Sequence, residues 1–478
     1  MKYISLLLLI LCISCSKNET IKTASLQIEG VTDPYIIVTH AIDDVTFWTT
    51  NKDTIYPDQN GVFNFQKNIK KAQFATVQFT NERRNLILIP EEQVQLTQQD
   101  SSIQFVGLNH KGQELLNTMS RPHLDMNEYN KWISDTTAAQ IKDKIGVLLQ
   151  PELNNIDVLQ SQNKISVQFA TILKQEVNYF YALRTLQLVY TQFNIKGKIS
   201  NSLLLLAEET LQSYPLQTDY KSTDWNEYAL LALKDFSLYD KAIVESWDRG
   251  KIQELYEEDH LHPISFDLIN SYKDKDIAEK VGAYFLFYNL IQENFEKSLI
   301  GVYDSFEEQF PESVYLPYLD KEVDVVRTYY KKIDAAFPEG ISFIENQDYN
   351  SLNELMSDFK GTKYYVDVWA TWCGPCKQEF KHNKELEVLL KEYGYDKFYI
   401  SLDKEDRITK WKQDIKYFDL FGKHLRGNQA FFEDFEKVHS TYQGYIAIPQ
   451  YLIINENGEI VTNNAPRPSQ LDKLKELL

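Results

Sequence analysis

The feature that most constrains this chain is a pair of cysteines, Cys373 and Cys376, set between two differently patterned segments. Residues 364–369, before the pair, form an apolar and aromatic run typical of a buried strand. Residues 377–391, after the pair, repeat apolar residues at helical spacing. Two intervening residues bring both sulfurs to the first turn of that helix, where Pro375 fits because no N–H is needed there. The pattern predicts a strand followed directly by a helix that begins with a dithiol.

The start of a helix favours thiol chemistry. Its N–H groups and dipole stabilise a thiolate over a thiol, and the thiolate is the nucleophile. We therefore expect Cys373 to attack and Cys376, one turn further on, to be shielded and to resolve a mixed disulfide. Three other uses stay open. The first is zinc binding, which would need two more ligands and has only His382 nearby. The second is a structural disulfide, which would constrain the unfolded chain little because it spans only two intervening residues. The third is peroxidase chemistry.

The residues around the dithiol carry a family resemblance. Residues 366–380, VDVWATWCGPCKQEF, resemble the thioredoxin superfamily, specifically its TlpA/ResA-like thiol-disulfide oxidoreductases. A second motif, residues 444–452, contains Ile448-Pro449, which the resemblance implies is a cis peptide facing the dithiol. The resemblance covers roughly residues 340–478, under a third of the chain. It implies a thioredoxin-like fold, a redox-active disulfide between Cys373 and Cys376, and no cofactor.

Further site residues follow from the resemblance. Asp367 and Glu379 match acidic residues that lie near the dithiol in the family, and we expect both to be catalytic. A carboxyl group buried beside a thiol can have its pKa raised and then accept the proton of Cys376. No metal site is expected. The residues expected to contact a disulfide substrate are Trp372, Gly374, Pro375, Ile448 and Pro449.

The N-terminal residues have the pattern of a secretion signal. Lys2 is followed by the apolar run 4–13, which is shorter than the roughly 20 residues needed to span a bilayer. Cys12-Ile13-Ser14-Cys15 resembles a bacterial lipobox, which implies a signal peptide over residues 1–14, lipidation of Cys15 and a polar tether over residues 15–23. A plain signal peptide with incidental cysteines is the alternative. We expect a periplasm-facing protein of the cell envelope, anchored to a membrane by lipid.

The rest of the chain divides by its periodicity. Residues 24–107 contain short β-branched and aromatic runs separated by turn signals such as Asn60-Gly61, and they loosely resemble a β-rich domain that precedes thioredoxin modules in Gram-negative lipoproteins. Residues 108–335 show helical spacing. Residues 336–478 alternate strand and helix signals and end in a helix predicted from Ser469, with an approximate capping box. The predicted fold is multidomain: an N-terminal all-β domain, a central all-α domain and a C-terminal α/β thioredoxin-like domain.

Charge and cysteine content narrow the function. The chain has a formal net charge of −19, so a nucleic-acid partner is not expected. Its four cysteines are too few for a disulfide-stapled fold. The sequence therefore predicts a protein-disulfide reductase that acts on disulfides of exported proteins and receives electrons from a membrane donor. The alternative is a lipid-anchored binding or recruitment module in which the thioredoxin-like domain is secondary.

Overall fold

A computed structural model describes residues 21–478, except 44, 47–50, 100–101, 120, 122–136, 218–221, 345–348 and 440–446. The chain forms two compact units, Met1–Tyr288 with Gly301–Asp320 and Asn289–Ile300 with Lys321–Leu478. The predicted signal peptide, Cys15 and most of the predicted tether lie outside the described residues, and the first strand begins inside the tether, at Lys22. In the described part of the chain, no helix combines the length and the apolar character needed to cross a membrane.

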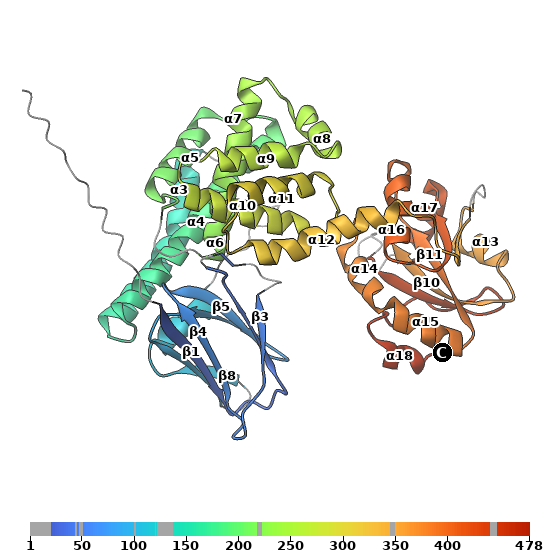
Figure 1. The fold of residues 1–478 in the computed structure, drawn as a ribbon, viewed down its shortest axis with the longest axis horizontal. Helices are drawn as coiled ribbons and strands as arrows, with labels where there is room; N and C mark the ends of the chain where they lie inside the picture. The colour runs from blue at the N-terminus through green and yellow to red at the C-terminus, as the bar shows by residue number, and fades with distance from the viewer. Residues whose placement is uncertain are drawn as a thin grey trace, which may run out of the picture. The chain divides into compact units, whose positions relative to one another are not determined.

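The first unit begins with two four-stranded β-sheets that share one apolar core (Figure 1). One sheet consists, in order, of β4 (Phe63–Ile69), β1 (Lys22–Glu29), β7 (Gln93–Gln99) and β8 (Ser102–Val106). The other consists of β3 (Lys52–Ile55), β2 (Ile36–His40), β5 (Gln73–Gln78) and β6 (Arg83–Leu88). Alternate residues along the strands, such as Leu26 and Val77, are buried in the shared core. The β-rich segment predicted near the N-terminus is therefore present.

The first helix, α1 (His110–Thr118), covers the outer edge of β6. The Gln113 amide accepts a hydrogen bond from the Ile87 N–H and donates one to the Ile87 carbonyl, at 3.1 and 2.8 Å. Asn117 makes the same pair of bonds with the backbone of Asn85, at 2.7 and 2.9 Å. Side-chain amides thus satisfy backbone groups that an edge strand would otherwise leave open.

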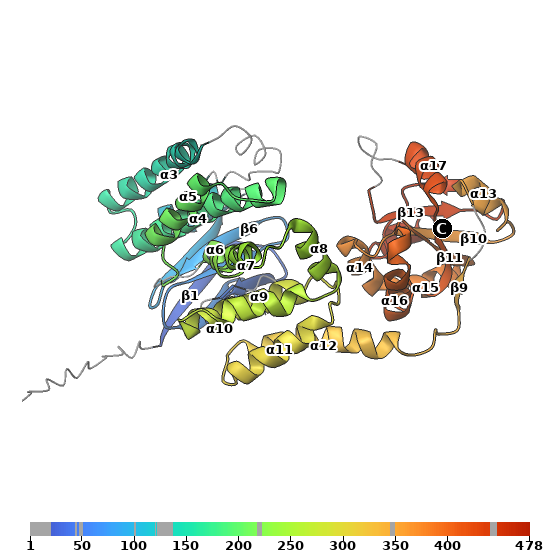
Figure 2. The ribbon, with the colours of Figure 1, turned by 90° about the horizontal axis from the view of Figure 1, so that it is seen from above.

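Helices fill the rest of the first unit (Figure 2), as predicted for the central part of the chain. They include α3 (Ala138–Ser161), α4 (Val167–Lys196), α5 (Asn201–Ser213), α6 (Thr223–Leu230), the π-helix η1 (Leu231–Phe236), α7 (Ser237–Val244), α8 (Arg249–Glu257), α9 (Leu261–Asn270), α10 (Lys275–Leu290) and α11 (Ser298–Gln309). The next helix, α12 (Leu316–Ile333), begins in the first unit, but most of it belongs to the second. The long α4 is capped by Ser166, whose hydroxyl accepts a hydrogen bond from the Phe169 N–H. The helix is followed by Gly197, whose φ of 73° is a left-handed conformation that favours glycine. The chain enters the second unit at Asn289, returns at Gly301, and re-enters within α12.

The second unit is built on one six-stranded sheet with helices on both faces. The sheet consists, in order, of β14 (Ile460–Thr462), β13 (Gln450–Ile454), β10 (Lys363–Trp369), β11 (Tyr395–Ser401), β12 (Gly422–Arg426) and β9 (Ile341–Phe343). The helical segments are α13 (Leu352–Ser357), α14 (Gly374–Glu379), η2 (Phe380–His382), α15 (Asn383–Glu392), η3 (Glu405–Arg407), α16 (Ile408–Tyr417), α17 (Gln429–His439) and α18 (Leu471–Lys475). On β10, Val366 and Val368 pack with α13 and α17, whereas Tyr365 and Trp369 pack with the opposite helices. The predicted thioredoxin-like fold is confirmed.

Candidate functional site

The two cysteines lie where β10 gives way to α14. All but the first residue of β10 is buried, and four residues later Cys373 occupies the N-cap position of α14. The Cys376 N–H donates a hydrogen bond to Cys373 Sγ at 3.2 Å, and Pro375 lies in the first turn. A 3₁₀ turn, η2, then connects α14 to α15. The predicted order of strand, dithiol and helix is therefore correct, although the helix is interrupted.

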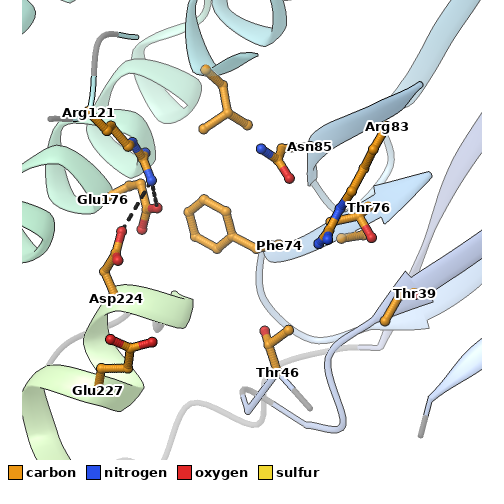
Figure 3. Close-up of a pocket in the computed structure, with 12 residues that line it drawn as sticks. Thr39, Thr46, Phe74, Thr76, Arg83, Asn85, Arg121, Glu176, Asp224 and Glu227 are labelled. Carbon is orange, nitrogen blue, oxygen red and sulfur yellow. Dashed lines mark hydrogen bonds and ion pairs between the residues drawn. The ribbon is translucent and has the colours of Figure 1, made fainter. Parts of the chain in front are cut away.

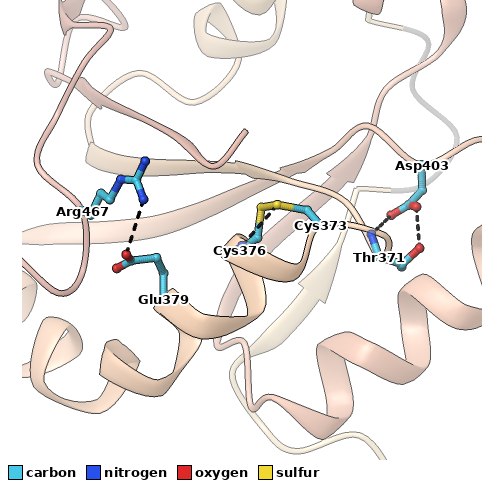
Figure 4. The surroundings of a disulfide bond; sticks show 6 residues. All are labelled: Thr371, Cys373, Cys376, Glu379, Asp403 and Arg467. Carbon is cyan, nitrogen blue, oxygen red and sulfur yellow. Dashed lines mark hydrogen bonds and ion pairs between the residues drawn. A yellow bond between two sulfur atoms is a disulfide. The ribbon is translucent and has the colours of Figure 1, made fainter. Parts of the chain in front are cut away.

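Cys373 and Cys376 form a disulfide with their Cα atoms 5.3 Å apart (Figure 4). Their exposed fractions are 4% and 0%. Both pack in an apolar cluster that includes Trp369, Phe380 and Trp411. The disulfide is therefore part of the apolar core, where water has little access to it.

An exposed rim surrounds the disulfide. Trp372 is 58% exposed, and Gly374 and Pro375 are also exposed. The Ile448–Pro449 peptide is cis, as predicted, and half-buried Ile448 packs against the apolar cluster that contains both cysteines. The structure therefore brings the predicted substrate-contacting residues to the dithiol and its surroundings. The first three residues of the second motif, 444–446, lie outside the described part of the chain.

Asp367 is buried on the dithiol side of the sheet. It lies between Tyr365 and Trp369 on β10, and its side chain alternates onto the same face as theirs. Asp367 is 1% exposed, and neither carboxyl oxygen has a hydrogen-bond partner among the described residues. Burial raises the pKa of Asp367 to about 7; the Glu379 charge adds to this rise and the Lys397 charge opposes it. A carboxyl group with this pKa can exchange a proton near neutral pH.

Lys397 on β11 is a site residue that the sequence analysis missed. Burial lowers its pKa to about 8, against the opposing charges of Asp367 and Glu387. Its ammonium group donates a hydrogen bond to Asn383 Oδ1 at 2.7 Å and lies 3.9 Å from Glu387. A lysine within the strand sequence KFYIS was the available signal, because a buried lysine needs a partner.

Glu379, at the end of α14, contacts the loop that precedes α18. Its carboxylate accepts hydrogen bonds from the Ser469 N–H at 3.0 Å and hydroxyl at 3.1 Å, and Arg467 lies 3.8 Å away (Figure 4). The predicted helix start at Ser469 is wrong: α18 begins at Leu471, after Gln470, without a side-chain cap. Ser469 lies before the helix and donates both of these hydrogen bonds to Glu379. The structure thus gives Glu379 a positioning contact, and its catalytic role stays a prediction.

Asp403 holds the loop that carries Cys373. This fully buried carboxylate accepts hydrogen bonds from the Thr371 N–H at 2.9 Å and the Thr371 hydroxyl at 2.7 Å (Figure 4). It also accepts one from the Ser401 hydroxyl at 2.8 Å. Thr371 is two residues before Cys373. The sequence analysis missed this anchor, although Asp403 lies only two residues after the buried strand β11. Charged hydrogen bonds of this kind fix the loop conformation.

Part of the site comes from upstream of the thioredoxin-like segment. Lys377 on α14 is 1% exposed, and its ammonium group donates a hydrogen bond to the Glu293 carbonyl at 2.7 Å. Two residues on, Phe295 stacks on Tyr329 of α12 at a centroid distance of 4.2 Å. Lys410 lies over the Phe295 ring at 4.6 Å. Residues 289–300 and the end of α12 therefore belong to the dithiol-bearing unit, which begins well before residue 336.

The geometry is compatible with dithiol exchange through Cys373 and Cys376. The sulfurs are already bonded to each other. His382 is exposed, and the described residues include no cluster of three or more His, Cys, Asp or Glu side chains suited to a metal ion.

Comparisons with known proteins agree with the geometry for this segment. Residues 334–478 match the Redoxin family model. The chain is 30% identical over 108 residues to a thiol-disulfide oxidoreductase ResA of Bacillus thuringiensis, covering 22% of this chain and 56% of the relative. It is 30% identical over 105 residues to the ResA of Oceanobacillus iheyensis, covering 22% and 50%. A solved thiol-disulfide oxidoreductase from Bacteroides fragilis is 25% identical, with 25% of this chain and 84% of that chain covered and a TM-score of 0.20.

These matches concern the C-terminal part alone. The chain spans about half the length of the curated relatives that it matches. Its relatives are named as thiol-disulfide oxidoreductases, and residues 334–478 combine a Redoxin match with a thioredoxin-like fold and a dithiol at the start of its first long helical segment.

Proposed function

We propose that this chain is a thiol-disulfide oxidoreductase that reduces disulfide bonds of exported proteins through Cys373 and Cys376. The observation that carries the proposal is the disulfide at the N-terminus of α14, beside an exposed Trp372 and the cis Ile448–Pro449 peptide. The names of the curated relatives support the same reaction class.

The reaction begins with the reduced dithiol. The Cys373 thiolate, stabilised by the N-terminal end of α14, attacks one sulfur of a substrate disulfide. A Cys373–substrate disulfide forms, and the displaced substrate thiolate takes up a proton. Cys376, deprotonated by Asp367, then attacks Cys373 Sγ and displaces the second substrate thiolate, which is protonated in turn. Two electrons and two protons pass to the substrate, and the enzyme is left with the Cys373–Cys376 disulfide.

The completed cycle needs a reductant. A membrane-bound dithiol donor would return two electrons to the Cys373–Cys376 disulfide, which is the only redox centre that the mechanism uses, so no further cofactor is required. Reduction is useful in an oxidising compartment, because exported proteins acquire disulfides there. Lipidation at Cys15 would hold the protein at the membrane of the cell envelope, close to such a donor.

Cysteine variants test the mechanism. The chain from residue 16 onward contains only the two site cysteines, so every labelled thiol can be assigned. Cys373→Ser is expected to lose reduction of a model protein disulfide such as insulin. Its matched control, Cys376→Ser, is expected to accumulate a mixed disulfide through Cys373, visible by mass. Full activity of Cys373→Ser would refute the proposal.

The direction and location need separate measurements. Titration of the dithiol against glutathione or dithiothreitol should give a potential near that of thioredoxin, about −270 mV, for a reductant; a value near about −120 mV would indicate an oxidant. In cells, Cys15→Ala should abolish labelling by fatty acid and release the protein from membranes. Cys12→Ala should leave both unchanged, and the reverse pattern would contradict the assignment of Cys15.

A further inference from the structure

A cavity of about 440 Å³ lies in the first compact unit, remote in sequence from the dithiol. One wall is the outer face of β2, β5 and β6, and the other comprises α1, α4 and α6 (Figure 3). On the sheet, Thr39, Thr76 and Asn85 form a row across three paired strands. Their neighbours Val38, Val77 and Leu86 point into the core instead. The volume is within the range of small-molecule sites, roughly 300–1,000 Å³.

The helical wall is acidic. Glu176 on α4 and Asp224 and Glu227 on α6 line it, together with Arg121. One guanidinium nitrogen, Arg121 Nη1, contacts both Glu176, at 2.9 Å, and Asp224, at 3.1 Å (Figure 3). Three carboxyl groups therefore share a single lining cation on this wall. Arg184 acts electrostatically on Glu227 but donates its hydrogen bond to Gln187.

Several polar groups in this wall lack a partner within the described residues. Glu176 is 5% exposed, and its Oε2 has no donor among the described residues, although its carboxyl group also interacts with that of Asp224. Arg121 Nε and Nη2 and the hydroxyl of Thr46 are also unsatisfied there. The Glu227 side chain makes neither a hydrogen bond nor an ion pair among the described residues, and Arg184 acts on it only through its charge. Leaving such groups buried and unpaired is costly, so a ligand that supplies donors to the carboxylates would be bound favourably.

Burial raises the pKa of two carboxyl groups in this wall. It raises the pKa of Asp224 well above its usual value, with the Glu176 charge adding to the rise and Arg121 opposing it. It also raises the pKa of Glu227, against the opposing charge of Arg184. A bound cation would reverse both effects by stabilising the ionised form.

The opposite wall has a different chemistry. Arg83 and Asn85 project from β6, and the apolar ring of Phe74 lies between them and the acidic wall (Figure 3). Arg83 is exposed and makes no side-chain ion pair among the described residues, so its guanidinium is available to a carboxylate. The cavity is thus acidic at one end, apolar in the middle and basic at the other end.

We propose that this cavity binds a small zwitterion with a guanidinium or ammonium group at one end and a carboxylate at the other, as in a free basic amino acid. The cationic group would lie against Glu176 and Glu227, the aliphatic chain over Phe74, and the carboxylate beside Arg83 and Asn85. An anionic ligand would meet the acidic wall unfavourably, and a purely apolar one would leave the same groups unpaired. The proposal is independent of the redox function.

Calorimetric titration of the chain from residue 16 onward tests the proposal with four probes. L-Arginine and L-lysine should bind saturably. Citrulline, which has the shape of arginine without the charge, and agmatine, which lacks the carboxylate, should each bind about tenfold more weakly than arginine or worse. Absence of saturable binding of arginine and lysine up to about 10 mM would overturn the proposal. Citrulline or agmatine binding as tightly as arginine would overturn it as well.

Variants locate the site. Glu227→Gln should weaken arginine binding about tenfold or more, and Arg83→Gln should weaken arginine binding while leaving agmatine unchanged. Glu312→Gln, at an exposed acidic residue of the same unit, is the matched control and should bind arginine normally. Circular dichroism melting confirms that each variant is folded. Normal arginine binding by folded Glu227→Gln and Arg83→Gln would overturn the assignment of this cavity.

Discussion

Replacing Asp367 with asparagine tests whether the buried carboxyl group serves the dithiol. Burial moves its pKa from 3.8 to about 7, which at roughly 1.4 kcal/mol per pKa unit makes ionisation about 4 kcal/mol more costly in the folded protein. Below pH 3.8 the carboxyl group is neutral in both the folded and the unfolded protein, so its burial does not lower the free energy of unfolding there. As the pH rises through 7 the group ionises in the folded protein too, and this stability is lost. Asp367→Asn cannot ionise, so its stability advantage should grow from near zero at pH 4 to about 4 kcal/mol at pH 8.

The stability of two linked units is not one quantity, so the measurement must be local. Hydrogen exchange of the β10 amides reports the opening free energy of the sheet that contains Asp367. The oxidised protein is the form to compare, because the structure contains the disulfide. An equal opening free energy for Asp367→Asn and wild type at pH 8 would show that the carboxylate is not destabilised by burial.

The same variant should change the pH dependence of the exchange reaction. With a pKa of about 7, Asp367 is about 1% ionised at pH 5 and about 90% ionised at pH 8. If its carboxylate deprotonates Cys376, resolution of a Cys373–glutathione mixed disulfide should accelerate roughly 90-fold over this range and level off above pH 7. Asp367→Asn should be about 100-fold slower at pH 8 and should keep accelerating towards the ordinary thiol pKa, about 8.5.

Rapid mixing with oxidised glutathione, an acid quench and mass analysis resolve this step. Lys397→Met supplies the matched control, because it removes the cation that stabilises the Asp367 carboxylate. Its profile should keep the plateau but move the midpoint above pH 7. An Asp367→Asn profile that matches wild type in rate and midpoint would refute the role of Asp367 as the base.

Three further predictions concern the surroundings of the dithiol. Asp403→Ala leaves buried donors of Thr371 and Ser401 unpaired and should lower the melting temperature of the second unit by about 4–8 °C in calorimetry, whereas an unchanged melting temperature would contradict the anchoring role. Phe295→Ala should cost the unit about 3–5 kcal/mol by hydrogen exchange, with the half-exposed Phe337→Ala as a nearly neutral control, and equal losses would argue against the stacking contact. Glu379→Gln should speed hydrogen exchange of the Ser469 amide, which donates to Glu379, yet slow the resolution step less than tenfold. A rate loss as large as that of Asp367→Asn would make Glu379 the catalytic acid-base group.

The parts of the site that sequence could predict are local ones. The strand before Cys373 is an apolar and aromatic run interrupted only by Asp367, and the two cysteines after it have the spacing of a helical turn. Ile448-Pro449 was predictable because a motif identifies it without knowledge of its contacts. The helix start at Ser469 failed for the opposite reason: a hydroxyl that could cap α18 is held by Glu379, 90 positions earlier in the chain. The contact between Ser469 and Glu379 joins distant segments, so the local sequence around Ser469 does not indicate it.

Contacts between distant segments also explain what was missed. Lys397 belongs to the site because β11 pairs with β10, and nothing local in its own strand indicates that Asp367 is nearby. Asp403 anchors Thr371 across 32 positions. Such pairings depend on the register of a parallel sheet, which periodicity alone does not give.

Residues 289–300 belong to the second compact unit, although they lie within the segment 108–335 that shows helical periodicity. Glu293 and Phe295 have positive φ values of 52° and 59°, which side-chain-bearing residues rarely adopt, so no local propensity predicts their conformation. This unfavourable backbone conformation is compensated by the stacking of Phe295 on Tyr329 and by the hydrogen bond that Lys377 of α14 donates to the Glu293 carbonyl. Because the chain enters this unit at 289, leaves at 301 and returns at 321, truncation at residue 336 would remove these contacts and expose buried cations. Loss of activity in such a fragment would therefore not favour a binding module over an enzyme; substitutions within the whole chain are the comparison that separates them.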